Sequence, residues 1–337
     1  MLKIIRLNQS REWNEIIQSM NEYDFYHLAE YHKLDQSGEA LLLYYRSSNA
    51  SFAFPIILRE IEGTPYKDIT SVYGYAGPLS RNLIFSEEDI LLFQNELKKF
   101  FDQNNIIVAF SRLHPFFKNQ HLLFRNLGEV VDANITVSID LTLPEIEQRS
   151  QYSHSVRNDI NRLEKGKIQM KKAETRKEID AFIDIYRENM KRVNASDRYF
   201  FSDQYFYDFL ESIKSTLLLA YIDNVLVSGS LFTTCNGILQ SHLSATKDKY
   251  LDQSPLKYVW DRIRILGTKE KMKAFHLGGG YGGQNDTLYE FKSQFSKQQF
   301  MFKIWKYIHN QDIYNSLVCG ENKENLSSSS YFPLYRE

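Results

Sequence analysis

The chain has 337 residues, of which 43% are hydrophobic, 25% charged and 14% aromatic. These proportions are typical of a soluble globular protein and exclude the disordered and membrane classes. The formal net charge of −1 excludes a strong overall attraction to polyanions, and the length favours two domains over one. The two cysteines, Cys235 and Cys319, lie far apart, and no cysteine or histidine pattern has ligand spacing. We therefore expect neither a disulfide scaffold nor a metal site.

The N-terminal sequence MLKIIRLNQSREW is too polar for the apolar segment of a secretory signal. No apolar run approaches the length that spans a bilayer. We therefore expect a cytoplasmic protein.

The first half of the chain alternates between strand-like and helix-like patterns. Three short β-rich runs, an amphipathic helix and a buried strand are expected, in this order, at residues 41–45, 52–58, 69–73, 87–101 and 106–110. Pro115 is expected to open a further helix that ends near Leu127, and residues 135–141 alternate as a strand. This succession predicts one α/β unit. The polar stretch at residues 142–152 is the best candidate for a domain boundary.

The second half begins with a helix expected at residues 153–166, where Gly166 occupies a C-cap position. A strand, two helices and three strands are expected next, at residues 168–172, 177–194, 203–213, 217–222, 225–234 and 238–245. The Asn-Gly pair at 236–237 is a strong hairpin signal between the last two strands. The Ser-Pro pair at 254–255 predicts an N-cap and a first-turn proline for a helix that ends near Gly267.

The most informative segment is HLGGGYGGQNDTLYEFKSQFS at residues 276–296, which follows a strand expected at 274–277. Five of the fifteen glycines lie in GGGYGG at 278–283, so the backbone there can adopt positive φ and approach a ligand closely. Thr287 and Glu290 have the spacing of a capping box, which predicts a helix from about Leu288.

This predicted helix carries a lysine on its apolar face. The residues at i, i+3, i+4 and i+7 of the face are Leu288, Phe291, Lys292 and Phe295. Because an unpaired buried ammonium costs much free energy, Lys292 must extend to water, pair with an acid or face a cavity. A last strand is expected at residues 299–306, and the aromatic end YFPLYR is expected to dock back after a polar linker.

The element order of residues 168–306 is strand, two helices, three antiparallel strands, helix, strand, helix and strand. This order resembles the GNAT acyltransferase layout, and a looser version of it is present in the first half. We therefore predict an α/β (α+β) protein with two tandem GNAT-like acyl-CoA N-acyltransferase domains, whose mixed, mostly antiparallel sheets are flanked by helices. The expected parts are the two domains and a polar linker with the C-terminal tail, at residues 1–145, 146–320 and 321–337.

Four motifs give the chain a resemblance to the Fem family, which comprises aminoacyltransferases and FemAB-like proteins of polysaccharide loci. They are DFYHLAEYH at residues 24–32, YGYAGP at 73–78, RNDINRLEKG at 157–166 and LYEFKSQF at 288–295. The resemblance implies a peptidoglycan precursor as acceptor and an aminoacyl-tRNA as donor. It further implies that Lys292 stabilises the oxyanion at the reacting centre and that Phe291 walls the donor site. The side chains that remain open for proton transfer are Tyr281, Tyr289, His276, Glu30 and His242.

The resemblance also implies an acceptor site. Arg157, in a stretch at residues 149–177 with nine basic and three acidic side chains, would bind a phosphate of a nucleotide-linked acceptor. The expected acceptor-binding residues are His27, Glu30, Tyr31, Tyr73, Tyr75, Arg157, Gly279 and Gly280. Peptidoglycan Fem enzymes commonly carry an acid shortly after the Gly-Pro pair, whereas the pair at 77–78 is followed here by Leu-Ser-Arg. A peptidoglycan peptide and a nucleotide-linked amino sugar therefore both remain candidate acceptors.

The donor is expected at the segment ATKDKYLDQSPLK, residues 245–257. Acyl-CoA GNATs have a glycine-rich loop here whose amides cradle pyrophosphate, and this segment contains no glycine. The sequence therefore favours an aminoacyl-tRNA or another carrier over acyl-CoA, as a co-substrate rather than a tightly bound cofactor. The expected donor-binding residues are Lys247, Lys249, Ser254 and Lys257.

The leading prediction is a Fem-like transferase that moves an acyl or aminoacyl group to an amine of a cell-wall or polysaccharide precursor. Three alternatives remain: a CoA-dependent N-acetyltransferase of an amino sugar, a non-catalytic nucleotide-sugar binding protein, and a tRNA-binding protein without transfer activity. The expected partners are such a precursor and charged tRNA, with peripheral contact to a lipid-linked precursor and with neither DNA nor an integral membrane segment.

Overall fold

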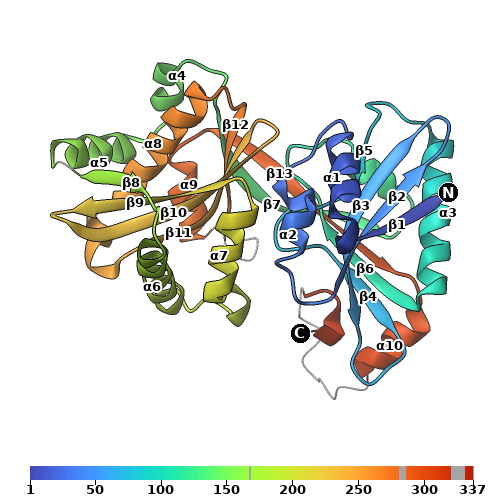
Figure 1. Ribbon diagram of the computed structural model, residues 1–337. Helices are drawn as coiled ribbons and strands as arrows, with labels where there is room; N and C mark the ends of the chain where they lie inside the picture. The colour runs from blue at the N-terminus through green and yellow to red at the C-terminus, as the bar shows by residue number, and fades with distance from the viewer. Residues whose placement is uncertain (167, 281–285, 320–330, 337) are drawn as a thin grey trace. The chain divides into compact units, whose positions relative to one another are not determined.

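The computed structural model describes residues 1–166, 168–280, 286–319 and 331–336. Tyr281 and the polar linker at residues 321–330 lie outside these residues. The chain divides into two compact units: unit 1 comprises Met1–Ala133 with Met301–Glu337, and unit 2 comprises Asn134–Phe300 (Figure 1). The expected boundaries at 145 and 320 fall elsewhere because two long strands, β7 (Glu129–Asp140) and β13 (Gln298–Ile308), each contribute residues to both units.

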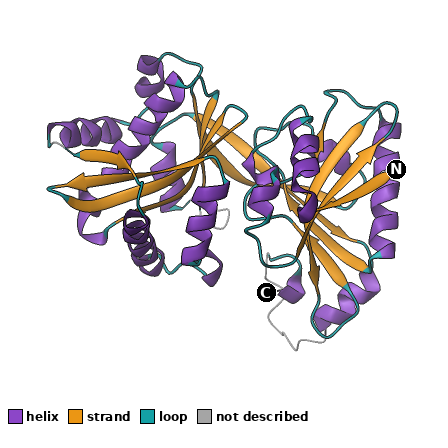
Figure 2. Cartoon of the chain, viewed as in Figure 1, coloured by secondary structure: helices purple, strands orange, loops and turns teal. Residues whose placement is uncertain are grey.

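Unit 1 is a mixed sheet with helices packed against it (Figure 2). Its strand order is β1-β2-β3-β4-β6-β13, β5 pairs with β3, and only the β4–β6 pair among these is parallel. The strands other than β13 are β1 (Leu2–Arg6), β2 (Glu39–Arg46), β3 (Ser51–Glu60), β4 (Lys67–Thr70), β5 (Leu79–Ser80) and β6 (Ile106–Arg112). The α-helices are α1 (Ser10–Gln18), α2 (Ala29–His32), α3 (Glu87–Gln103) and α10 (Gln311–Cys319). Four of these elements were not predicted from the sequence patterns: β1, α1, α2 and α10.

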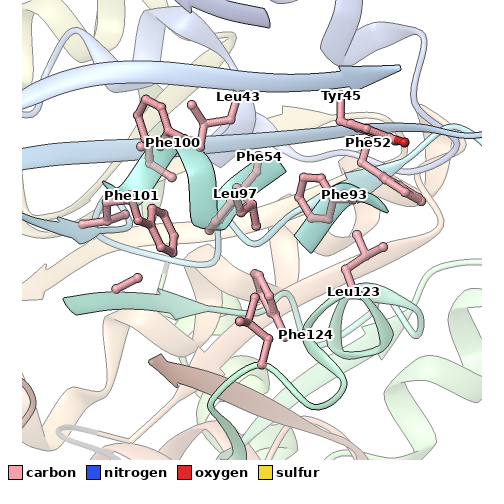
Figure 3. Close-up of a cluster of buried hydrophobic side chains, with 14 of the residues drawn as sticks. Leu43, Tyr45, Phe52, Phe54, Phe93, Leu97, Phe100, Phe101, Leu123 and Phe124 are labelled. Carbon is pink, nitrogen blue, oxygen red and sulfur yellow. The ribbon is translucent and has the colours of Figure 1, made fainter. Parts of the chain in front are cut away.

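The core of unit 1 combines aromatic rings with aliphatic side chains (Figure 3). The helix α3 starts where the Ser86 hydroxyl accepts the Asp89 N–H, and it buries Phe93 and Leu97 against the sheet. The rings of Phe124 and Trp305 stack with centroids 3.8 Å apart. Strand β13 therefore contributes Trp305 to the core of the first unit, although it follows the whole of unit 2 in sequence.

The helix predicted from Pro115 to about Leu127 is wrong. A short 3-10 helix, Gln120–Phe124, forms instead. The amide oxygen of the Gln120 side chain accepts the His114 N–H, and the His114 ring accepts the Phe116 N–H. The N–H groups of Phe117, Leu122 and Arg125 donate to carbonyls three residues back, so the segment folds as successive turns rather than as a continuous α-helix.

The C-terminal end YFPLYR packs on unit 1, as the sequence predicted. The Tyr335 hydroxyl and the Arg336 guanidinium both donate to the buried Asp68 carboxylate, at 3.0 and 2.9 Å. Arg59 donates to the other oxygen of the same carboxylate at 2.7 Å. The tail is thus held by a three-donor contact at one buried acid.

Unit 2 contains the remaining strands of the same mixed sheet, flanked by helices. Its strand order is β7-β12-β11-β10-β9-β8, and only the β11–β12 pair is parallel. The strands other than β7 are β8 (Gln169–Lys172), β9 (Ser215–Ile222), β10 (Val225–Cys235), β11 (Ile238–Thr246) and β12 (Ala274–Gly279). The α-helices are α4 (Glu145–Ser150), α5 (His154–Lys165), α6 (Arg176–Arg192), α7 (Asp203–Ser212), α8 (Pro255–Lys269) and α9 (Thr287–Ser293).

Local signals in unit 2 mostly give the predicted elements. The Ser153 hydroxyl accepts the Val156 N–H at the start of α5, and Gly166 is its C-cap. Asn236 and Gly237 have positive φ, as the predicted hairpin requires. Ser254 precedes Pro255 at the start of α8, but its side chain makes no capping hydrogen bond and its backbone is left-handed.

No helix in the described part of the chain combines the length and the apolar character needed to cross a membrane.

Candidate functional site

The helix α9 positions Lys292 and begins one residue earlier than the sequence suggested. Its N-cap is Asp286, whose carboxylate accepts the Tyr289 N–H at 2.8 Å, so Thr287 is the first helical residue rather than the cap. The predicted apolar face is only partly buried, since Leu288 is 42% exposed while Phe295, just beyond the helix, is fully buried.

The Lys292 ammonium lies against the end of β12. Its Nζ donates to the carbonyl oxygen of Gly279 at 2.6 Å. Gly278 has a φ of +78°, and a Cβ atom at this residue would lie 3.1 Å from Nζ. Among the described residues no carboxylate forms an ion pair with Lys292. The ammonium is therefore held by a carbonyl, with part of the residue still accessible.

Aromatic rings pack around Phe291, the residue that precedes this lysine. Phe291 packs edge-on against Trp260 of α8, with ring centroids 5.3 Å apart, and against Phe295 at 5.6 Å. Trp260 also meets Phe275 of β12 at 6.1 Å. Phe291 thus belongs to an apolar wall between α8 and α9. The Tyr289 hydroxyl accepts a hydrogen bond from the Gln299 side chain at 2.8 Å.

Burial lowers the pKa of the Lys292 ammonium from 10.5 to about 8, and the negative charge of Asp286 opposes this shift. The side chain therefore remains mainly cationic at neutral pH and loses its proton in mildly alkaline solution. A cation in apolar surroundings interacts more strongly with a developing negative charge than the same cation in water.

The parallel pairing of β11 and β12 is short. It runs from the Ile238–Ala274 pair to the Gln240–His276 pair, where the Gln240 side chain bonds the His276 ring. Beyond this point Gly278 and Gly279 continue to pair with β7 on the other side. The carbonyl that holds Lys292 therefore lies just past the point where the two central strands stop pairing.

The structure brings Lys292, Phe291, Tyr289 and Gly279 together. The expected donor-binding residues lie in or next to the 3-10 helix before α8 and in the first turn of α8. Lys257 is buried, and its ammonium contacts the Asp159 carboxylate at 2.7 Å and the Ser155 hydroxyl at 3.3 Å. Lys249 is exposed and Lys247 partly exposed. Of the expected donor lysines, Lys257 is thus already neutralised by a partner on α5.

The remaining expected residues of unit 2 lie at the edges of this region. Gly280 is the last described residue before the gap at 281–285. Arg157 lies on α5, where its guanidinium donates to the Ser150 carbonyl at 3.3 Å. The donor Nη1 is one of several on the guanidinium, so Arg157 retains capacity for a phosphate.

Three expected acceptor residues of unit 1 hold that unit together. His27 is fully buried and bonds the Asp24 backbone in the 3-10 helix Phe25–His27. The Glu30 carboxylate accepts from the Asn14 amide at 2.8 Å. The buried Tyr31 donates its hydroxyl to the Tyr73 carbonyl at 2.8 Å.

The two expected tyrosines of the YGYAGP segment differ. Tyr73 is 41% exposed. Tyr75 packs edge-on against Phe302, His114 and Tyr26, with ring centroids 5.1, 6.0 and 5.7 Å apart. Tyr73 is accordingly the more accessible of the two for contact with a ligand.

The two histidines considered for proton transfer are both enclosed. His242 bonds the Tyr205 hydroxyl at 2.8 Å and stacks on Phe209, and burial lowers its pKa to about 3. His276 is fully buried beside Gln240. An imidazole whose pKa is about 3 is a weak base at neutral pH, which argues against His242.

Sequence reasoning missed three features around Lys292. Asp286 was overlooked because it precedes Thr287, which also favours a cap position. Trp260 lies 32 positions before Lys292 in the sequence, so no local pattern joins them. The particular role of Gly278 is hidden because it is one of five glycines at residues 278–283. Outside this region, the buried pair of Asp24 and His114, whose Nε2 lies 3.2 Å from the carboxylate, was missed as well.

The chain matches no family model and no curated protein. Solved structures nevertheless share its fold, which is a tandem GNAT fold. It is similar to FemX, with a TM-score of 0.74 and 11% identity over 94% of this chain and 99% of that one. It is also similar to L-PGS from Bacillus licheniformis, with a TM-score of 0.59 and 12% identity over 91% and 94% of the two chains. A tandem GNAT protein from the clavulanic acid biosynthesis pathway has a TM-score of 0.50 and 9% identity over 91% and 98%. The Fem-like fold predicted from the motifs is confirmed.

Proposed function

We propose that this protein is a Fem-like transferase that moves an acyl or aminoacyl group from an activated carrier to an amine. The observation that carries this proposal is the desolvated Lys292 ammonium, which is held by the Gly279 carbonyl and follows Phe291, whose ring packs on Trp260. A cation in such a setting suits a reaction in which negative charge develops on an oxygen. The overall similarity to FemX and L-PGS supports the same class of reaction.

In the proposed reaction the acceptor amine attacks the carbonyl carbon of an ester or thioester. A C–N bond forms and the carbonyl oxygen becomes an oxyanion, towards which the Lys292 ammonium is directed. Collapse of this intermediate breaks the bond to the carrier oxygen or sulfur, and the proton lost by the amine passes to that leaving group. The ammonium keeps its own proton throughout, so its contribution is electrostatic. Tyr289 and Tyr281 remain candidates for the proton transfer.

The acceptor we propose is an amine of a cell-wall or polysaccharide precursor, either a peptidoglycan peptide or a nucleotide-linked amino sugar. Arg157 retains guanidinium donors for a phosphate, and Tyr73 offers an accessible ring. Tyr75, Gly279 and Gly280 are the other proposed acceptor-binding residues that remain partly accessible. Tyr31 would act through the position of the Tyr73 backbone, whose carbonyl accepts its hydroxyl. His27 and Glu30 bond Asp24 and Asn14 and would support the local fold of unit 1 rather than touch the acceptor.

An aminoacyl-tRNA is our first choice of donor. The segment before α8 forms a 3-10 helix, Asp248–Gln253, rather than a glycine loop, and Lys257 is neutralised by Asp159. One observation keeps acyl-CoA as the second candidate. The Ser254 side chain does not cap α8. Pro255 has no N–H and the Lys257 N–H donates to the Ser254 carbonyl at 3.0 Å, so the Leu256 N–H is the first-turn donor that we assign to an anion such as pyrophosphate.

The donor and the reaction are tested together by offering two labelled donors, acetyl-CoA and charged tRNA, to the full chain with a panel of amine acceptors. The panel contains a nucleotide-linked amino sugar and a peptidoglycan precursor. We expect label to move from charged tRNA to an acceptor, together with retention of the charged tRNA on a filter. A thermal shift and transfer with acetyl-CoA alone would favour the N-acetyltransferase instead. Binding of a nucleotide sugar without transfer from either donor would contradict the enzymatic proposal.

A further inference from the structure

The strand β12 is irregular immediately before the carbonyl that holds Lys292. Its pairing with β7 shifts register between His276 and Gly278, because His276 faces Ser138 and Gly278 faces the adjacent Val137. Gly278 has a φ of +78°, a conformation that other residues adopt only with strain. Such bulges redirect the groups that follow them, here the Gly279 carbonyl.

The missing side chain of Gly278 matters for one neighbour. Apart from chain neighbours, the Lys292 Nζ is the one described heavy atom within 4 Å of the place where a Cβ would lie, at 3.1 Å. Gly279 is constrained for a different reason, because its Cβ would lie 2.6 Å from the Ile135 carbonyl oxygen of β7. The first glycine thus faces the ammonium, whereas the second faces the sheet.

We propose that Gly278 is a positioning residue for the Lys292 ammonium: it leaves open the space beside Nζ and directs the Gly279 carbonyl towards it. The importance of this position for catalysis rests on the proposed transferase function, but the position itself does not. A methyl group at residue 278 would displace Nζ from its present place towards water. The displaced ammonium would be better solvated, so its titration would move towards that of an ordinary lysine.

The test is competitive labelling of the full-length protein with acetic anhydride between about pH 6 and pH 11, where only neutral amines react. Mass spectrometry of the peptide that contains Lys292 gives the midpoint of its titration. We expect Gly278→Ala to raise this midpoint by at least ~0.5 pH unit. Gly63→Ala is the matched control, because Gly63 also has positive φ, +72°, but no described atom lies within 4 Å of the place where its Cβ would lie. An unchanged midpoint in Gly278→Ala, or an equal rise in Gly63→Ala, would overturn the proposal.

The double variant Gly278→Ala/Lys292→Ala keeps the test decisive if Gly278→Ala alone does not fold. When the lysine is absent, the methyl group has no ammonium to displace, and only backbone strain remains. We expect the double variant to fold. Its decrease in Tm relative to the wild-type protein should be close to that of Gly63→Ala. If neither the single nor the double variant folds, the requirement for glycine does not involve Lys292 and the proposal fails.

These outcomes are independent of the transferase reaction, because the labelling needs neither donor nor acceptor. If Gly278→Ala shifts the midpoint but Lys292→Ala transfers at the full rate, Gly278 still positions the ammonium, and Lys292 has no catalytic role. In the transfer assay, Gly278→Ala should lower the rate about tenfold or more in the presence of Lys292 and have little effect in its absence.

Discussion

The two units share one architecture but differ in how they bury titratable groups. Unit 1 encloses His27, His32 and His114, and burial lowers the pKa of these imidazoles to about 3, 4 and 3, so they are neutral at physiological pH. Unit 2 partly encloses the Lys292 ammonium, whose pKa of about 8 leaves it charged. The comparison teaches that a motif residue is a better candidate for chemistry when its surroundings leave it charged and without an acidic ion-pair partner. Neutral, fully packed motif residues such as His27 are assigned a structural role.

The largest expected difference between the units is the loss of stability when an aromatic ring is removed from each of them. Phe124→Ala removes a ring that stacks on Trp305 in unit 1, and it should lower the free energy of unfolding by about 3–5 kcal/mol. Phe291→Ala removes a partly exposed ring of unit 2 and should cost clearly less stability while lowering transfer. Denaturant unfolding of both variants measures the difference. Equal losses would show that Phe291 is an ordinary core residue.

The second expectation concerns acid. The buried histidines have folded-state pKa values of about 3 to 4, below the ordinary 6.5, so the unfolded chain binds more protons between these values. Their stabilising contribution is therefore complete above pH 6.5 and is lost as the pH falls through this window. Asp24, whose pKa burial raises to about 7, acts in the opposite direction but is a single group.

Unit 2 encloses fewer imidazoles among the described residues: His242, whose pKa burial lowers to about 3, and the fully buried His276. Hydrogen exchange followed segment by segment should therefore show unit 1 losing protection before unit 2 as the pH falls from 6.5. Simultaneous loss in both units, or earlier loss in unit 2, would contradict this account of the buried histidines.

The third expectation concerns alkaline pH. If transfer needs the protonated Lys292, its rate should fall about tenfold per pH unit above pH 8. Stability should change in the opposite sense. The folded-state pKa of about 8 lies below the ordinary 10.5, so the unfolded chain binds more protons in this window. The destabilising effect of this lysine is complete below pH 8 and disappears as the pH rises to 10.5.

A comparison with Lys292→Met isolates both effects, because methionine keeps the length of the side chain without the charge. The difference in unfolding free energy between the two proteins should shrink from pH 8 to pH 10. A rate that rises steadily with pH would instead indicate that the neutral amine is the active form.

The smallest expected effect concerns the hydroxyl of Tyr31. Tyr31→Phe removes its hydrogen bond to the Tyr73 carbonyl and should cost about 1 kcal/mol of stability. Tyr73→Ala, in contrast, removes an exposed side chain and should raise the KM for the acceptor with little loss of stability. Melting curves and steady-state kinetics on the two variants distinguish the roles. A raised KM with unchanged stability in Tyr31→Phe would assign that hydroxyl to acceptor binding.

Elements with local signals were predictable from the sequence, and those fixed by distant partners were not. Ser153, Gly166 and the Asn-Gly turn at 236–237 act within a few residues, and the elements they bound form as predicted. The segment predicted as a helix from Pro115 instead folds as turns after the buried His114, whose Nε2 lies 3.2 Å from the carboxylate of the distant Asp24. Local patterns do not contain that information.

The same distinction applies to the candidate site. Lys292 was predictable because a charge interrupts an apolar face of a single helix. The state of Lys257 was not, because the acid that neutralises it lies 98 positions away on α5. The Gly279 carbonyl and the bulge at Gly278 depend on how β12 pairs with β7, so the position of the ammonium could only be seen in the fold.

The central claim is that the Lys292 ammonium stabilises the oxyanion of an acyl transfer. The most direct test is the transfer rate of Lys292→Ala from the donor that the wild-type protein accepts, with Lys171→Ala as a control for loss of an exposed lysine that pairs with Glu178. We predict that Lys292→Ala binds donor and acceptor nearly normally but transfers about 100- to 1,000-fold more slowly, while Lys171→Ala transfers at the wild-type rate. Transfer by Lys292→Ala within a few-fold of the wild-type rate would contradict the account.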